Sequence, residues 1–183
     1  MRYSLPKAAS LALLAGALLL PAVPASATTV TNTAAVLDDP FSVFKVSVKA
    51  PKTAKAGGNL TYKISAVNTG PHSADAWFVG GEFPKGVDLK KIRYASSVAK
   101  TECFGEGRAF FCYAPKVLEK GDGVTLAFYT KLKKNAKGAQ KATLGIISYD
   151  VQQGMEDMSK EELDRLGIPV NGYPKSVTTK VVR

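Results

Sequence analysis

The sequence predicts an all-β protein: an antiparallel β-sandwich with one short helical insertion. Three observations support this fold class. Apolar and polar residues alternate in several short segments, which is typical of half-buried strands. Clusters of Gly, Pro, Asn and Asp recur about every ten residues. One late segment carries helix boundary signals instead. A β-barrel is the alternative architecture.

The first predicted strands occupy residues 44–49 and 60–66. In both, every second residue is apolar, so one face of each strand would be buried and the other solvated. Gly57-Gly58 marks the turn between them. Two more strands are expected at residues 77–79 and 91–98, on either side of a turn at Pro84-Lys85-Gly86.

Cys103 and Cys112 are the only cysteines of the chain. Strand-like residues 101–104 and 109–114 flank a Gly-rich link, so a hairpin would bring the two thiols together. An oxidising compartment would then favour a disulfide, and the alternative is a pair of buried free thiols. Four nearby aromatic residues are expected to form a core around this hairpin: Trp77, Phe110, Phe111 and Tyr113.

A tight turn at residues 120–123 precedes the last three predicted strands, at residues 124–132, 142–151 and 176–182. An insertion at residues 152–174 interrupts them. Within it, Ser159 is the expected N-cap of a two-turn helix, Glu162 its capping-box partner, and Gly167 lies just past the helix end. Six of the 15 acidic residues fall between positions 150 and 164.

The first 27 residues resemble a secretory signal peptide. Arg2 and Lys7 begin it, an apolar run covers residues 8–20, and Ala25 and Ala27 form a small-residue cleavage site. An uncleaved membrane anchor is the alternative, but the apolar run is short for a membrane span. We therefore expect a secreted, extracellular protein without a transmembrane anchor. A flexible leader would cover residues 28–40 and the sandwich residues 41–183.

A family resemblance extends these expectations. Asn68-Thr69-Gly70-Pro71, then Ser73-Ala74 and Phe83-Pro84-Lys85-Gly86-Val87, resembles the conserved repeat of bacterial secreted and surface proteins known as domain of unknown function number eleven. The match continues through both cysteines to Leu118 and Gly121 and covers about residues 46–132. The resemblance implies an immunoglobulin-like sandwich that serves as a spacer or adhesive module, without enzymatic activity.

The chain departs from this family in two ways. Gly81 stands where the family usually has an aspartate, so no role of that carboxylate carries over. The family usually occurs as tandem repeats, whereas this chain holds one copy. A role as spacer between domains is therefore not implied.

Catalytic and metal-binding patterns are weak. His72 is the only histidine and lies in a loop without a nucleophile elbow, so a solvated surface residue is the better interpretation. Asp150, Glu156 and Asp157 offer hard oxygen ligands for calcium, but their spacing matches no known loop. We expect no cofactor and no enzymatic activity.

The net charge of +10 is the remaining feature with functional content. Lysines and arginines form two groups in the sequence: Lys131, Lys133, Lys134, Lys137 and Lys141, and then Lys90, Lys91 and Arg93. Such residues can simply keep an edge soluble and unpaired. Alternatively they attract an anionic polymer of the cell envelope. Nucleic acid is not expected, because aromatic and basic residues do not interleave.

Two functional hypotheses follow. The first is a non-catalytic secreted module that associates with the cell envelope through its basic surface. The second is a secreted inhibitor or effector that presents the insertion to an envelope protein, with Ile168, Pro169 and Val170 as its apolar tip. A hydrolase with an unrecognised site is a third and weaker alternative.

Overall fold

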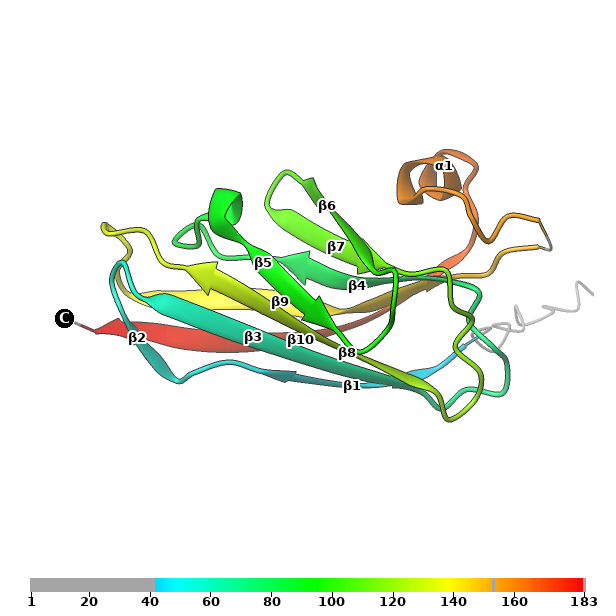
Figure 1. The fold of residues 1–183 in the computed structure, drawn as a ribbon, viewed down its shortest axis with the longest axis horizontal. Coiled ribbons are helices and arrows are strands. Elements are labelled where there is room, and N and C mark those ends of the chain that lie inside the picture. The colour runs from blue at the N-terminus through cyan, green and yellow to red at the C-terminus, as the bar shows by residue number, and fades with distance from the viewer. Residues whose placement is uncertain (1–41, 153, 183) are drawn as a thin grey trace, which may run out of the picture. The chain divides into compact units, whose positions relative to one another are not determined.

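The computed structural model describes residues 42–152 and 154–182. Two β-sheets face each other across an apolar core (Figure 1). The four-stranded sheet has the order β1-β3-β8-β5, and the six-stranded sheet has the order β2-β10-β9-β4-β7-β6. The predicted immunoglobulin-like sandwich with one short helix is therefore confirmed.

The elements have these bounds in chain order: β1 Phe44–Lys49, β2 Thr53–Lys55, β3 Asn59–Asn68, β4 Ala76–Glu82, the 3-10 helix η1 Leu89–Lys91, β5 Arg93–Ser96, β6 Glu102–Glu106, β7 Ala109–Tyr113, β8 Gly123–Lys131, β9 Ala139–Tyr149, α1 Lys160–Arg165 and β10 Val170–Val182. The alternation of apolar and polar residues turns one face of these strands toward the core, as predicted. In β3 and β8, for example, Ile64 and Leu126 are a buried pair, while the neighbouring Lys63 and Ala127 face outward.

The segment between β1 and β3 contains a strand that the sequence did not indicate. After β1, the chain passes through Pro51 to the other sheet, where β2 pairs in parallel with β10. The hydroxyl of Thr179 donates a hydrogen bond to the Pro51 carbonyl at 2.7 Å. Three residues are too short to show an alternation, so β2 was expected to be part of a turn.

Strand β10 is almost twice as long as predicted. It pairs with β9 from Val170 opposite Tyr149 to Lys180 opposite Ala139. The prediction placed residues 170–174 in the insertion, and Pro174 cannot donate a hydrogen bond to a strand ladder. Pro174 is tolerated because β2 pairs only with residues 180–182 and leaves this part of β10 as an edge. The insertion therefore ends at residue 169.

The main core contains Trp77, which is 2% exposed and belongs to the same buried cluster as Phe44 and Tyr62. Its indole Nε1 donates a hydrogen bond of 2.6 Å to the Lys116 carbonyl. The expected burial of this residue is thus confirmed. Tyr62 packs edge-on against Phe83 at 5.3 Å between ring centroids.

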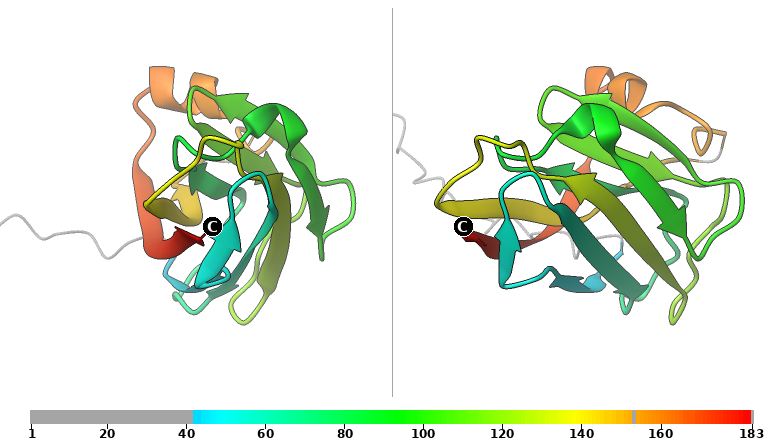
Figure 2. Two further views of the ribbon diagram at one scale, coloured as in Figure 1. Left: turned by 90° about the vertical axis from the view of Figure 1, so that its left-hand side faces the viewer. Right: turned by 60° about the vertical axis from the view of Figure 1, so that its left-hand side comes forward.

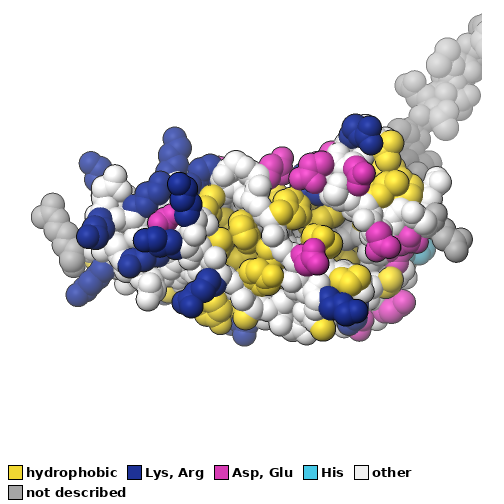
Figure 3. All heavy atoms as spheres, turned by 45° about the horizontal axis from the view of Figure 1, so that its top comes forward, with side chains coloured by type: hydrophobic (Ala, Val, Ile, Leu, Met, Phe, Trp, Pro, Cys, Tyr) yellow, Lys and Arg dark blue, Asp and Glu magenta, His cyan; other side chains and the backbone are white. Residues whose placement is uncertain are grey.

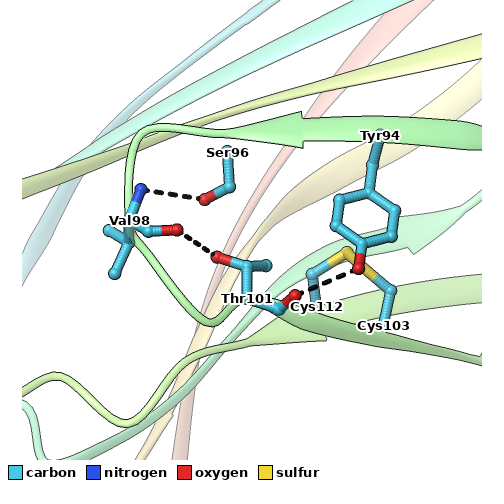
Figure 4. The surroundings of a disulfide bond; sticks show 6 residues. All are labelled: Tyr94, Ser96, Val98, Thr101, Cys103 and Cys112. Atoms are coloured by element: carbon cyan, nitrogen blue, oxygen red, sulfur yellow. Dashed lines mark hydrogen bonds between the residues drawn. A yellow bond between two sulfur atoms is a disulfide. The ribbon is translucent and has the colours of Figure 1, made fainter.

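The disulfide between Cys103 and Cys112 is confirmed. The two residues are directly opposite in the β6–β7 hairpin. Figure 4 shows Tyr94 of the other sheet beside the bond; its hydroxyl donates to the Thr101 carbonyl at 3.0 Å. This contact ties β5 to the segment that enters β6.

The aromatic residues of this hairpin do not form one core. Phe110 packs against the main core, whereas Phe111 lies on the outer face of the six-stranded sheet. Tyr113 is 38% exposed. The expectation of a common core around the disulfide was wrong for these two residues, because alternation along β7 directs Phe111 and Tyr113 away from the main core.

A second apolar cluster forms on that outer face, where the insertion folds back over the sheet (Figure 2). Leu163 of α1 is fully buried among residues of β4 and β9, including Phe78 and Tyr149. The predicted capping box of Ser159 and Glu162 is present, and Gly167 has a positive φ of 68°. The insertion is therefore packed on the sandwich and is not projected from it.

Candidate functional site

The structure brings both predicted lysine groups to one end of the sandwich. The Lys131 carbonyl accepts a hydrogen bond from the Asp88 amide beside η1, at 2.9 Å. The Lys133 amide donates to the Gly86 carbonyl at 2.8 Å. Figure 3 shows lysine and arginine gathered at this end of the visible face. We call the following set the basic end: Lys90, Lys91, Arg93, Lys131, Lys133, Lys134, Lys137 and Lys141.

Two residues that the sequence analysis did not single out position the loops of the basic end. Gln140 is buried; its side chain accepts a hydrogen bond from the Gly86 amide at 3.0 Å and donates one to the Lys137 carbonyl at 2.8 Å. The Arg108 guanidinium donates to the carbonyls of Phe83, Pro84 and Val87. Apart from Lys137, which precedes Gln140 by three residues, their partners lie 21 to 54 residues away in the chain, so no local pattern indicates these roles.

The cations of the basic end have no carboxylate partner among the described residues. The described residues form three ion pairs, and all three lie outside the basic end and involve Lys116 or Lys160. The eight side chains of the basic end belong to exposed residues. Their charge is therefore available to a ligand.

Acidic residues gather near the other end, around α1 (Figure 3). Lys160 Nζ lies 2.6 Å from Asp164 Oδ2 and 3.4 Å from Glu106 Oε2. Hydrogen bonds from Lys160 and from the Tyr149 hydroxyl hold the pKa of Asp164 below its ordinary value. Hydrogen bonds from the Ser159 amide and hydroxyl likewise lower the pKa of Glu162. These acids stabilise the insertion. Because they lie around α1 and the lysines lie at the basic end, the described sandwich carries negative charge near one end and positive charge at the other.

The structure does not assemble the candidate calcium ligands. The Glu156 carboxylate accepts hydrogen bonds from the Gly154 amide at 2.8 and 3.0 Å. Within the described ranges, no group of three or more acidic, histidine or cysteine residues is placed to hold a metal ion, and Asp150 and Asp157 belong to none. His72 lies in an exposed loop, where its carbonyl accepts a hydrogen bond from the buried Asn68 side chain.

The apolar tip expected at Ile168, Pro169 and Val170 does not project. The Pro169 carbonyl accepts a hydrogen bond from the Asp150 amide at 2.8 Å, and Val170 is the first residue of β10. Ile168 packs against the cluster around Leu163. The expected geometry was wrong because Val170 begins β10 opposite Tyr149 and Pro169 is hydrogen-bonded to Asp150 just beyond that pair. Whether they bind a partner stays a hypothesis.

Other expectations lie outside the described residues, namely the signal peptide, its Ala25 and Ala27 cleavage site, and the leader at residues 28–40. They stay predictions. Within the described ranges, no helix is long and apolar enough to cross a membrane.

Comparison with known protein families found no match, and comparison with curated proteins found none. Solved structures are similar in fold. The cohesin module of a Clostridium perfringens family 33 glycoside hydrolase has a TM-score of 0.46 and 8% identity, over 76% of this chain and 97% of that chain. A non-cellulosomal cohesin from Archaeoglobus fulgidus has a TM-score of 0.43 and 14% identity, over 76% and 92%.

The PapD-like domain 7 of human CEP192 has a TM-score of 0.39 and 13% identity, over 85% of this chain and 96% of that chain. At these identities the similarity concerns the fold alone. The resemblance to domain of unknown function number eleven stays a hypothesis.

Proposed function

We propose that this protein is a non-catalytic binding module of the cell envelope, and that its basic end attaches it to an anionic envelope polymer. The observation that carries this proposal is the set of eight exposed cations at one end of the sandwich, none of them in an ion pair within the described ranges. Like charges held close together repel one another, so a polyanion that neutralises them is attracted.

The scaffold supports the same proposal. Gln140 and Arg108 fix the loops that present Lys137 and its neighbours, through hydrogen bonds to carbonyls and amides. A set of lysines that served solubility alone would need no such fixed presentation. Loops that are already fixed lose less conformational freedom when a polymer binds.

Binding to a teichoic-type poly(glycerol phosphate) and to isolated bacterial envelopes tests the proposal. We expect binding at about 0.05 M salt and its loss at about 0.5 M, because the Debye length then falls well below 10 Å. Changing Lys131, Lys133, Lys134 and Lys137 to Gln should release the protein at low salt.

The matched control is a second fourfold change to Gln, at four exposed lysines outside the basic end: Lys45, Lys100, Lys120 and Lys175. It lowers the net charge equally, and we expect it to bind normally. Equal loss in both variants would contradict a localised site. Unchanged binding of the basic-end variant would overturn the proposal.

A second candidate function is docking of a protein partner through the insertion. Leu166 and Val170 favour it, because both are 51% exposed and flank the packed residue Ile168. This hypothesis predicts envelope binding that persists at about 0.5 M salt and is lost in Leu166→Asp. The basic-end variant would bind normally in that case.

A further inference from the structure

One part of the basic end is hollowed into a groove of about 510 Å³. Its floor is the outer face of β3 and β8, and one wall is formed by η1 and the start of β5. The lining residues are Asn59, Thr61, Lys90, Lys91, Ile92, Arg93, Tyr129, Thr130 and Lys131. The volume lies within the ~300–1,000 Å³ of small-ligand sites.

The strand register sets the order of side chains across this groove. Tyr129 of β8 is paired with Thr61 of β3 on one side and with Arg93 of β5 on the other. Asn59 and Lys131 form the next pair on the same face, two residues further along each strand. Phe128 and Thr130 are buried, so alternation directs Tyr129 and Lys131 outward into the groove.

No contact among the described residues gives the Tyr129 side chain a structural role. It is 44% exposed although β8 lies in the interior of the four-stranded sheet. Neither apolar cluster includes it, and within the described ranges its hydroxyl makes no hydrogen bond and its ring meets no other ring. Ala127 and Ala95, the next outward pair along the strands, are small. The Tyr129 side chain is therefore accessible to a ligand.

The groove combines two kinds of recognition. An aromatic ring presents a flat apolar surface with a negative face, which suits the C–H faces of a pyranose. The Lys90, Lys91 and Lys131 ammonium groups can neutralise an anion, and the Arg93 guanidinium can bind a carboxylate or a phosphate with two hydrogen bonds. Asn59 and Thr61 supply donors and acceptors for hydroxyl groups.

We propose that this groove binds an anionic carbohydrate, with a sugar ring stacked on Tyr129 and its carboxylate or phosphate held by Arg93 and the lysines. The inference rests on the proposed function and narrows its ligand from any polyanion to one that carries sugar rings. A nucleic acid fits less well, because the groove holds a single ring and successive bases need several stacking platforms.

Three polymers separate ring from charge: polygalacturonate carries both, poly-L-glutamate carries charge without a ring, and dextran carries a ring without charge. We expect the parent protein to bind polygalacturonate most tightly, poly-L-glutamate more weakly and dextran not at all. Tyr129→Ala should weaken polygalacturonate binding about tenfold. It should leave poly-L-glutamate binding unchanged.

Three variants complete the design. Tyr129→Phe keeps the ring and should keep the affinity, whereas Tyr129→Leu keeps apolar bulk on the strand and should lose it. Tyr113→Ala removes a similarly exposed tyrosine, 38% against 44%, from the acidic end and should bind normally. Thermal unfolding of each variant confirms that it is folded, and Tyr129→Leu keeps the test valid should Tyr129→Ala unfold.

The possible failures are distinct. If the basic-end variant loses both charged polymers while Tyr129→Ala and Tyr129→Leu bind both normally, this inference is overturned and the proposed function stands. If single-stranded DNA displaces polygalacturonate and its own binding depends on Tyr129, the ligand class is wrong. If neither charged polymer binds the parent protein, both proposals fail.

Discussion

The hydroxyl of Tyr149 donates a hydrogen bond of 2.5 Å to Asp164 Oδ1 and so joins β9 to α1. Tyr149 is 1% exposed, and burial is the main cause that raises the pKa of its hydroxyl. Asp164 also accepts a hydrogen bond from Lys160, which in turn lies 5.6 Å from the Phe111 ring centroid. These contacts dock the insertion on the sheet.

Tyr149→Phe should lower the free energy of unfolding by about 1 kcal/mol, because it removes this hydrogen bond and keeps the ring. Urea unfolding measures the effect. Tyr113→Phe is the matched control: its hydroxyl donates to Glu102 at 2.9 Å in an exposed position, and the expected loss is below about 0.5 kcal/mol. Equal losses of unfolding free energy in the two variants would show that burial does not strengthen the Tyr149 hydrogen bond.

The stability of the docked insertion should depend on pH. The pKa of Asp164 is lowered in the folded protein, first by the hydrogen bond from Lys160 and then by that from Tyr149. A lowered carboxyl pKa contributes stability that is complete above the ordinary value of about 3.9 and is lost as the pH falls through the folded pKa.

Urea unfolding from about pH 6 to about pH 2 should therefore show a gap between the parent protein and Asp164→Asn that closes below about pH 4. Glu162, whose pKa the Ser159 amide lowers, acts in the same direction in both proteins. A gap that widened on acidification would refute the assignment.

The insertion should be required for a well-packed six-stranded sheet. Leu163→Ala should cost about 2–5 kcal/mol because the residue is fully buried against the second cluster. Leu166→Ala, at a position that is 51% exposed, should cost less than about 0.5 kcal/mol. Removing residues 152–169 should expose Phe78 and Tyr149 and increase binding of an apolar dye.

The sequence alone predicts that a sandwich without residues 152–171 still folds, because the segment caps its own helix; the packing of Leu163 with Phe78 and Tyr149 adds that this shortened sandwich is less stable. A deletion variant that kept its stability and bound no dye would contradict this role of the packing.

Reduction of the disulfide should lower the free energy of unfolding by about 2–3 kcal/mol without abolishing folding, because the closed loop is short. The bond joins positions nine apart in the sequence. Unfolding with and without reductant measures the effect, and a Cys103→Ala, Cys112→Ala double variant should be insensitive to reductant. Free thiols in the intact mass of the non-reduced protein would contradict the pairing.

Trp77 is the only tryptophan, so its fluorescence reports on the core directly. We expect blue-shifted emission and little quenching by iodide. Trp77→Ala should cost about 3–5 kcal/mol through the cavity that it leaves, and it also leaves the Lys116 carbonyl without its indole partner. Emission at the wavelength of indole in water would contradict the buried position.

The sequence by itself predicted the sandwich, the disulfide and the capped helix. Each depends on local signals. Strands such as β3 show a period of two, the cysteines flank one hairpin, and Ser159, Glu162 and Gly167 mark the helix ends. Such patterns act through backbone sterics and hydrogen bonding over a few residues, and so the patterns could be interpreted without a tertiary structure.

Only the tertiary structure decided where these elements lie. In the structure, the insertion packs on Phe78 and Phe111, and β10 continues through Pro174. Lys90 and Lys131 line the same groove. The tertiary structure also placed Thr61, Tyr129 and Arg93 in one row across three strands. Strand pairing brings together residues tens of positions apart, and their contacts depend on register and sheet order, which local sequence does not encode.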